Sequence, residues 1–368
     1  MAWSVRPSAC ATVAGVAVVL ILPPPAAAGE RDVPAAGALA ATAPLEYTYS
    51  AALAHETSAM RTARARTRTR RLATEDGYSV DVQVTSAYAD NPSADQALVD
   101  FLGSRLHGPE LGALRVYVGT PREIVRLCGG APDAVACYAV AEARMYVPGE
   151  RVRGIPVEYA ITHEYGHHLA SRRSNDPWDA LDWGAKHWAS ATRVCTHVKK
   201  DRLFPGNQGA HYLDDPGEGF ADGYAHLHYP DVPWNYNELM RPGRSEFAAI
   251  RRDVLRPWVR NRTRTFRGRL GPGRGTRAFT IRLTLDGELA LRLTAPRGGS
   301  YSVEAATGGF ASGHVLRSGH GFGIEWCRRR RAEQVTLTVR RRAGRRSRPQ
   351  RAHHRGRTPF TLTASWPG

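Results

Sequence analysis

The segment "ITHEYGHHLA", residues 161–170, concentrates side chains that can bind a metal ion and move a proton. His163 and His167 are four residues apart, so on an α-helix they lie one turn apart and present two imidazoles to one point. A tetrahedral Zn²⁺ requires this of its first two protein ligands. Glu164 projects from the adjacent stripe of the helix, where its carboxylate can take a proton from a metal-bound water. The alternative is a polar helix face that binds no metal.

A catalytic zinc site needs a third protein ligand and keeps its fourth position for water. The pattern that supplies a third histidine, H-E-x-x-H-x-x-G-x-x-H, is not met, because its Gly position is Ala170 and its last His position is Arg173. His168 lies about 100° around the helix from His167, so we expect it to be structural or solvated. The third ligand must therefore come from elsewhere in the chain.

The third ligand is predicted in "DDPGEGFADGYAHL", about fifty residues downstream, where Glu218 and Asp222 are four apart on a second predicted helix. One carboxylate can bind the metal while the other accepts the free N–H of a ligating histidine and fixes its tautomer. We expect Glu218 to be the ligand and Asp222 to hold the histidine. The alternative is an acidic residue favoured by the helix dipole and an ordinary surface aspartate.

These two motifs together resemble the gluzincin zinc peptidases, which include thermolysin-like and lethal-factor-like members. "EGFAD" is similar to the second metal-binding helix of the lethal-factor type, and the resemblance extends over about residues 78–260. It implies a zincin-like metallopeptidase domain with Zn²⁺ held by His163, His167 and Glu218. Glu164 would be the general base, and Asp222 would support a ligating histidine.

The resemblance also implies a Tyr or His that hydrogen-bonds the developing oxyanion, often just upstream of the glutamate. His211 and Tyr212 are both near that position, and neither aligns cleanly. Tyr224 and His226 are weaker candidates. Each of the four could instead be a packing or surface residue.

Hydrophobic patterning predicts an α+β protein whose first part alternates strands and helices. Strands are predicted at residues 78–88, 111–120 and 142–149. Helices are predicted at residues 92–108, 121–130, 156–173, 177–202, 214–230 and 245–262. The strand at 143–147 is expected to be the sheet edge that holds an extended substrate. From residue 262, short alternating runs separated by Gly and Pro predict a small antiparallel β-sandwich.

Four regions follow from these patterns. Residues 1–28 have a positive start, a short apolar run and small residues at the end, which predicts a signal peptide. Residues 29–75 are rich in Ala, Thr, Pro and Arg without a hydrophobic period, which predicts a disordered linker or propeptide. The catalytic domain is expected at 76–261 and the β-sandwich at 262–368. No later run is long enough to span a membrane, so we expect a secreted protein.

Four cysteines follow the predicted signal peptide, and an even number in an oxidising compartment predicts two disulfides. Four cysteines permit three pairings. Cys128 with Cys137 closes the shortest loop, which leaves Cys195 with Cys327. The alternative is two or more free thiols.

The positive charge belongs to one region. Residues 262–368 contain 23 Arg, no Lys and five acidic residues, a formal charge of +18, whereas the whole chain carries +17. No aromatic-plus-basic motif supports a specific nucleic-acid site. An anionic cell-envelope polymer is the more common partner of such an exported region. Only three of the 51 basic residues in the chain are Lys, which indicates a coding bias towards Arg.

The sequence therefore predicts a secreted zinc metallopeptidase acting on a peptide or protein substrate. Two alternatives stay open. One is an envelope-binding protein whose zinc is structural, although such a site needs no base at Glu164. The other is a zinc hydrolase that acts on a non-peptide amide, such as a cell-wall cross-link.

Overall fold

The computed structural model describes residues 67–271, 275–296, 300–308, 310–316, 319–342 and 357–368. Helices and strands alternate in the first part and strands alone form the last, so the predicted α+β class is confirmed. The predicted signal peptide at 1–28 and most of the 29–75 segment lie outside the described residues. Among the helices described, none is long and apolar enough to cross a membrane.

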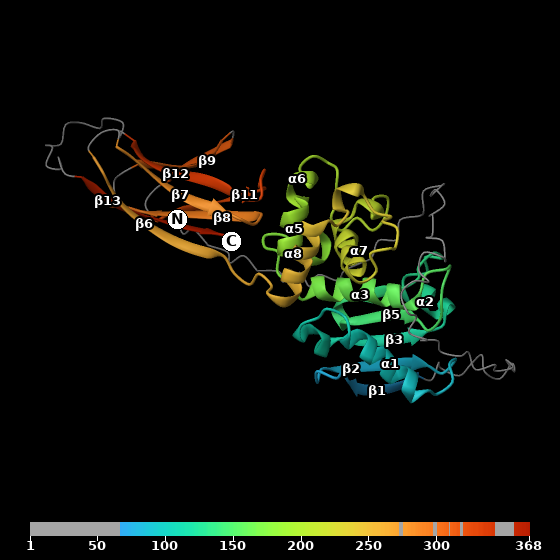
Figure 1. Ribbon diagram of the computed structural model, residues 1–368. Helices are drawn as coiled ribbons and strands as arrows, with labels where there is room; N and C mark the ends of the chain where they lie inside the picture. Colours follow the sequence, from blue (N-terminus) through green and yellow to red (C-terminus); the bar gives the residue numbers. More distant parts are fainter. Residues whose placement is uncertain (1–66, 272–274, 297–299, 309, 317–318, 343–356) are drawn as a thin grey trace, which may run out of the picture. The chain divides into compact units, whose positions relative to one another are not determined.

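A five-stranded mixed sheet with the order β1-β2-β3-β5-β4 forms the first part (Figure 1). The three central strands run parallel to one another, and each edge strand is antiparallel to its neighbour. The strands are β1 (Thr67–Ala73), β2 (Ser79–Thr85), β3 (Arg115–Gly119), β4 (Cys137–Ala139) and β5 (Arg144–Pro148).

The ordered part of the chain begins earlier than predicted. Residues 67–75 were expected to be disordered, but residues 67–73 form the edge strand β1. The strand pairs with β2 along its whole length. Arg70 makes ion pairs with Asp90 and with the buried Asp95. These partners lie 20 and 25 residues further along the chain. The composition of residues 67–75 alone could not reveal them.

The opposite edge of the sheet also differs from the prediction. β4 pairs with β5 from Arg144 to Tyr146, so the strand predicted as the free edge is covered there. The predicted disulfide between Cys128 and Cys137 is present and ties the first residue of β4 to the end of helix α2. The exposed edge is therefore β4, a strand too short to show a hydrophobic period in the sequence.

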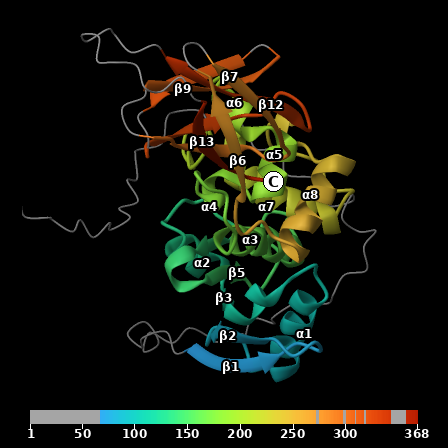
Figure 2. The ribbon, with the colours of Figure 1, turned by 90° about the vertical axis from the view of Figure 1, so that its left-hand side faces the viewer.

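Helices pack on the inner face of this sheet, and α3 lies between β5 and α7 in both views (Figures 1 and 2). The helices begin at recognisable caps. Asn91 caps α1, and Asp215 caps α7. The helices are α1 (Pro92–Gly103), α2 (Pro121–Leu127), α3 (Val157–Ser171), α4 (Ala180–Trp183), α5 (Lys186–Thr192), α6 (Val194–Val198), α7 (Pro216–His228) and α8 (Arg244–Leu255).

The single long helix predicted at 177–202 is three short ones, and this prediction is wrong. Gly184 between α4 and α5 has φ of 74°, and Arg193 between α5 and α6 has φ of 63°. Both values belong to the left-handed side of backbone space, which ends a right-handed helix. A Cβ at Gly184 would also lie 2.3 Å from a ring atom of Trp188. Tertiary packing therefore breaks a segment whose local pattern suits one helix.

The last part is a β-sandwich of two four-stranded antiparallel sheets that share one apolar core. The orders β11-β8-β13-β6 and β10-β9-β12-β7 are those of an eight-stranded jelly roll. The strands are β6 (Arg262–Leu270), β7 (Thr276–Leu283), β8 (Gly287–Thr294), β9 (Ser300–Thr307), β10 (Phe310–Leu316), β11 (Gly321–Trp326), β12 (Glu333–Arg342) and β13 (Thr358–Trp366).

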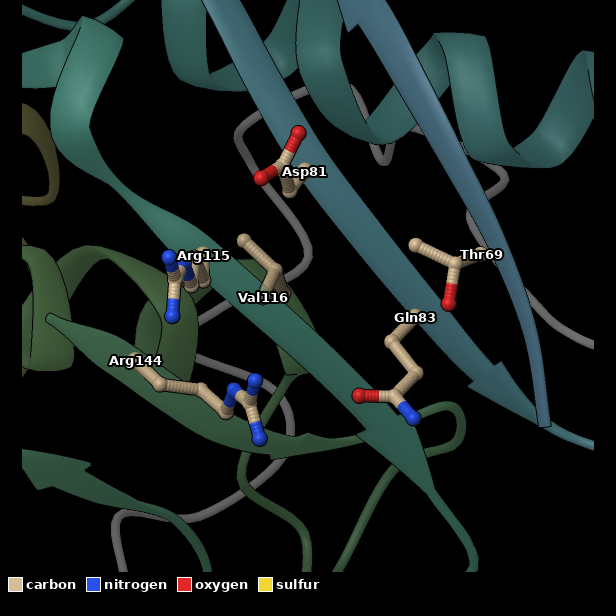
Figure 3. A pocket seen from close by; sticks show the side chains of 6 residues that line it. All are labelled: Thr69, Asp81, Gln83, Arg115, Val116 and Arg144. Atoms are coloured by element: carbon tan, nitrogen blue, oxygen red, sulfur yellow. The ribbon is translucent and has the colours of Figure 1, made fainter. Parts of the chain in front are cut away.

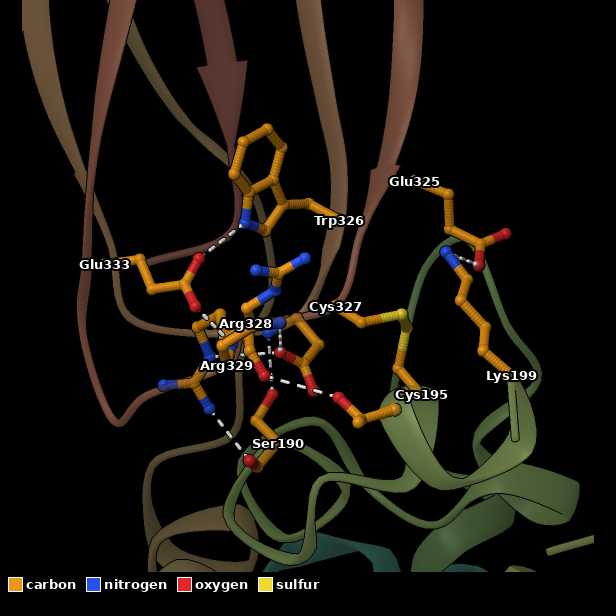
Figure 4. The surroundings of a disulfide bond; sticks show 11 residues. Ser190, Cys195, Lys199, Glu325, Trp326, Cys327, Arg328, Arg329 and Glu333 are labelled. Atoms are coloured by element: carbon orange, nitrogen blue, oxygen red, sulfur yellow. Dashed lines mark hydrogen bonds and ion pairs between the residues drawn. A yellow bond between two sulfur atoms is a disulfide. The ribbon is translucent and has the colours of Figure 1, made fainter. Parts of the chain in front are cut away.

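The second predicted disulfide, Cys195–Cys327, joins α6 to the residue that follows β11 (Figure 4). Buried hydrogen bonds surround it. Arg328 donates to the carbonyl of Ser190 at 2.8 Å and to the carboxylate of Asp286 at 3.1 Å. The backbone N–H of Asp286 donates to the Ser190 hydroxyl at 2.9 Å. The jelly roll is therefore linked to the helical part both covalently and by buried polar contacts.

Candidate metal centre

The site lies where α3 and α7 approach each other closely. Gly166 lies between the two histidines of α3 and faces Ala221 of α7. A Cβ at Gly166 would lie 2.6 Å from the Ala221 Cα and 2.9 Å from its carbonyl oxygen. No side chain fits that gap, so glycine allows the two helix backbones to approach closely. The side chains that flank this contact on each helix consequently meet.

Three buried side chains meet beside this contact. Nε2 of His163 lies 3.3 Å from Oε2 of Glu218, and Nε2 of His167 lies 3.4 Å from the same oxygen. One ligand atom from each side chain lies within 4.8 Å of the other two. The structure thus brings together the three residues that the sequence spacing predicts, as a group that could hold a metal ion.

Asp222, one turn after Glu218, lies behind His163. Its Oδ1 is 3.3 Å from Nδ1 of His163, so the carboxylate can accept the N–H of this nitrogen and leave Nε2 directed at the cluster. The hydroxyl of Tyr159 donates to the same oxygen at 2.7 Å, and Nδ1 of His226 lies 3.3 Å from Oδ2. Asp222 thus occupies the predicted supporting position, with two partners that the motif did not indicate.

The charges of the cluster are coupled. Burial alone would lower the pKa of His163, yet the carboxylates of Asp222 and Glu218 hold it well above its ordinary value. Burial would raise the pKa of Glu218, but the imidazoles of His167 and His163 hold it far below the usual range. Glu218 therefore stays ionised between two imidazoles. A divalent cation could bind there in place of the protons on the imidazoles, because metal binding releases protons from its ligands.

Glu164 is also buried, with 6% of its surface exposed. Burial raises its pKa above the ordinary value, although the two neighbouring imidazoles act in the opposite direction. Glu164 follows His163 directly on α3, and the charges of His163, His167 and Glu218 influence the pKa of its carboxyl group. This is the position in which a proton acceptor can act on a group held by the cluster.

Two tyrosines lie beside the cluster. The hydroxyl groups of Tyr212 and Tyr236 are 3.2 Å apart. Burial and then the Glu218 carboxylate raise the pKa of Tyr212 well above its ordinary value, so this phenol stays protonated as a donor. The ring of Tyr236 stacks on that of His163, with centroids 6.4 Å apart. Of the two predicted oxyanion donors, Tyr212 therefore lies at the site.

His211, the other predicted donor, faces elsewhere. Its ring stacks on Phe204 at 3.8 Å and its Nδ1 lies 3.4 Å from Asp214, while 41% of the side chain is exposed. The contacts that the structure describes for it include none of the three clustered side chains, so the structure does not bring His211 to the cluster. Tyr224 donates to the carbonyl of Leu106, which makes it a packing residue.

Sequence reasoning missed three residues of the site. Tyr159 precedes His163 by four positions, so the helical period of α3 could have indicated it. Gln208, whose amide lies 3.3 Å from Oε1 of Glu218, and Tyr236 carry no local signal, because loops bring both of them to the cluster. His226 was only a weak candidate for oxyanion donor, and it instead supports Asp222.

His168 is structural, one of the two outcomes expected for it. Its Nε2 donates to the carbonyl of Glu110 at 2.9 Å, and its Nδ1 accepts from the Tyr138 hydroxyl at 3.0 Å. The Glu110 side chain in turn accepts from Tyr165 at 3.1 Å and from Arg173 at 2.8 Å. This buried network fixes α3 on the side away from the cluster.

Two other places in the described residues could be mistaken for a site. Cys195, Glu325 and Cys327 lie close together, but the two cysteines are bonded to each other and offer no thiolate. A pocket on the outer face of the first sheet is lined by five polar side chains and by Val116 (Figure 3). Arg115 and Arg144 are register partners there, and neither group of metal-ligating side chains found among the described residues includes a residue that lines this pocket.

Comparisons with known proteins add little. No protein-family model and no curated protein sequence matches the chain. A mitogen derived from Yersinia pseudotuberculosis is similar over 29% of this chain and 86% of its own, with 11% identity and a TM-score of 0.21. The protein PirA is similar over 27% of this chain and 92% of its own, with 11% identity and a TM-score of 0.18. At such TM-scores these likenesses support no conclusion about fold or function.

Proposed function

We propose that this protein is a secreted zinc-dependent peptidase that hydrolyses peptide bonds in a peptide or protein substrate. One observation carries the proposal: two imidazoles and a carboxylate converge from two helices, and a second buried glutamate directly follows the first of these histidines on α3. A purely structural metal site has no use for Glu164. The two disulfides agree with export into an oxidising compartment.

Two separations within the cluster agree with a zinc site. Zn–N and Zn–O bonds are about 2.0–2.2 Å, so two ligands at a tetrahedral angle lie roughly 3.4 Å apart. The imidazole nitrogens of His163 and His167 lie 3.3 and 3.4 Å from Oε2 of Glu218. When bound there, Zn²⁺ would lower the pKa of a water molecule towards 7 and polarise the substrate carbonyl.

The chain's own residues would then move the protons. The carboxylate of Glu164 takes a proton from water as the water oxygen attacks the carbonyl carbon. When the C–N bond breaks, the same carboxyl group delivers that proton to the departing amine nitrogen. The buried surroundings of Glu164 keep bulk water from competing for the proton. Glu164 is therefore the general base and then the general acid of the proposed reaction.

Tyr212 would stabilise the charge that develops on the carbonyl oxygen. Its phenol is protonated and lies near Glu218, so it can donate a hydrogen bond that strengthens as the oxygen becomes negative. Tyr236 would orient that phenol, since the two hydroxyl groups are 3.2 Å apart and its own ring is held against His163. Tyr212 is the proposed donor and Tyr236 a positioning residue.

The replacement Glu164→Gln tests the proposal. We expect purified full-length variant to keep its zinc, measured by elemental analysis, and to lose about 10²–10⁴-fold in hydrolysis of a peptide library. Glu158→Gln, on the same helix but outside the cluster, is the matched control and should keep both zinc and activity. Zinc binding with no hydrolysis by the unaltered protein would contradict the proposal, as would full activity in Glu164→Gln.

A further inference from the structure

The outer face of the sheet β11-β8-β13-β6 is a second surface with a distinct chemistry. Along its central strand β13, Phe360, Leu362 and Ala364 are buried in the core, and the residues between them point outward. The outward residues have short side chains, and apart from Pro359 each has a hydroxyl group: Thr361, Thr363 and Ser365. They form a line of hydroxyl groups along the middle of the sheet.

Arginines stand on both strands that flank this line. On β6, Arg267 is paired in register with Thr361 and Arg269 with Pro359. On β8, Arg292 is paired with Thr363. All three arginines are exposed. Residues directly opposite on neighbouring strands have Cβ atoms about 5 Å apart, so each guanidinium can reach over the shorter β13 side chains.

None of these three arginines makes an ion pair or a side-chain hydrogen bond with another residue that the structure describes. The acidic residues of this face, Glu288 and Glu325, are register partners at the end of the sheet next to the Cys195–Cys327 disulfide. Glu325 is paired there with Lys199 at 3.1 Å. The rest of the face is therefore an uncompensated positive surface with a floor of hydroxyl groups.

We propose that this face binds a linear acidic polysaccharide lying along β13. Its carboxylate groups would pair with Arg267, Arg269 and Arg292, and its hydroxyl groups would hydrogen-bond to Thr361, Thr363 and Ser365. The described outward residues of this face include no aromatic ring, whereas binding of single-stranded nucleic acid depends on aromatic rings that stack on bases. The chemistry of the face therefore favours a sugar polymer over a nucleic acid. The proposal does not depend on the metal centre.

Binding of full-length protein to immobilised polygalacturonate, a linear sugar polycarboxylate, tests this proposal. We expect binding that weakens as salt is added, because exposed charges are screened. The triple variant R267A/R269A/R292A should bind about 10-fold or more weakly, as expected for the loss of three charge-assisted contacts. R277A/R282A/R340A removes the same charge from strands of the other sheet and should change the dissociation constant less than about 2-fold.

Two further measurements keep the test decisive. The double variant T361V/T363V keeps the charge and the β-branched side chains, and should weaken binding about 3-fold or more if the hydroxyl groups take part. Immobilised dextran, which is neutral, and a single-stranded DNA oligonucleotide are measured beside polygalacturonate. The proposal fails if the two arginine triples weaken binding equally, if polygalacturonate is not bound, or if the DNA is bound more tightly than polygalacturonate.

Discussion

The helical part and the jelly roll place their charged residues in opposite ways. On α7, Glu218 and Asp222 are each 4% exposed, and both face imidazoles supplied by α3. On the sheet that contains β13, Arg267, Arg269 and Arg292 are exposed and lack acidic partners in the described part of the chain. Burial makes a charge expensive unless it is paired, so the first group must be positioned accurately. The exposed arginines need no such accuracy, and it is enough that several of them lie on one face.

This difference predicts that single substitutions should be severe in the helical part and mild in the jelly roll. The largest effect is expected for Glu218→Gln, which removes a charged ligand candidate. Zinc affinity, measured by competition with a chelating dye, should fall by more than about 100-fold, beyond the range typical of residues that only support ligands. Glu325→Gln breaks a surface ion pair and should leave zinc affinity unchanged. Equal zinc affinity in the two variants would refute the assignment of Glu218.

Tyr212 and Tyr236 are expected to differ in their effect on the reaction, although both lie beside the cluster. Tyr212→Phe should lower kcat by about 10²–10³-fold with little change in KM, as expected for a donor used in the transition state. Tyr236→Phe should lower kcat by roughly 10-fold, because it removes only the group that orients Tyr212. Both variants should keep zinc and their melting temperature. A larger loss of kcat in Tyr236→Phe than in Tyr212→Phe would reverse the two roles.

Helix packing gives the next effect. Gly166→Ala places a methyl group against the backbone of Ala221, so α3 and α7 must move apart. We expect about 1–3 kcal/mol of lost stability in chemical unfolding, together with weaker zinc binding. Gly308→Ala, in a jelly-roll turn with no atom within 4 Å of the added carbon, is the control and should be neutral. Unchanged zinc affinity in Gly166→Ala would show that the site tolerates a shift of α7.

The last prediction concerns acid stability. Burial lowers the pKa of His168 from its ordinary 6.5 to about 4. Between these values the unfolded chain binds a proton at this residue and the folded chain does not, so stability falls as pH drops from about 6.5 to about 4. His168 should account for at most roughly 3 kcal/mol of that loss.

The measurement is denaturant unfolding of the unaltered protein and of His168→Gln at several pH values. His168→Gln should be less stable at neutral pH, because it disturbs the bonds to Glu110 and Tyr138. It should also lose less stability on acidification. Comparing the two proteins cancels the other titrating groups. If the free energy of unfolding fell equally with pH in the two proteins, His168 would not contribute to the loss of stability in acid.

Much of the candidate site could be predicted because its residues follow the period of single helices. His163 with His167, and Glu218 with Asp222, are each four apart, so spacing alone placed each pair on one face. Tyr236 and Gln208 could not be predicted, since loops carry them to the cluster. The strand β1 was missed for a similar reason, because its support comes from β2 and from distant aspartates.

The sequence by itself determined which side chains could bind a metal and where the alternating strands of the basic region begin. These depend on residue type and on periods of two and 3.6, which are local properties of the chain. Only the tertiary structure decided that α3 and α7 touch at Gly166, that Tyr212 rather than His211 lies at the cluster, and which jelly-roll face presents arginines beside hydroxyl groups. Those facts depend on contacts between residues far apart in the chain, and no local pattern encodes them.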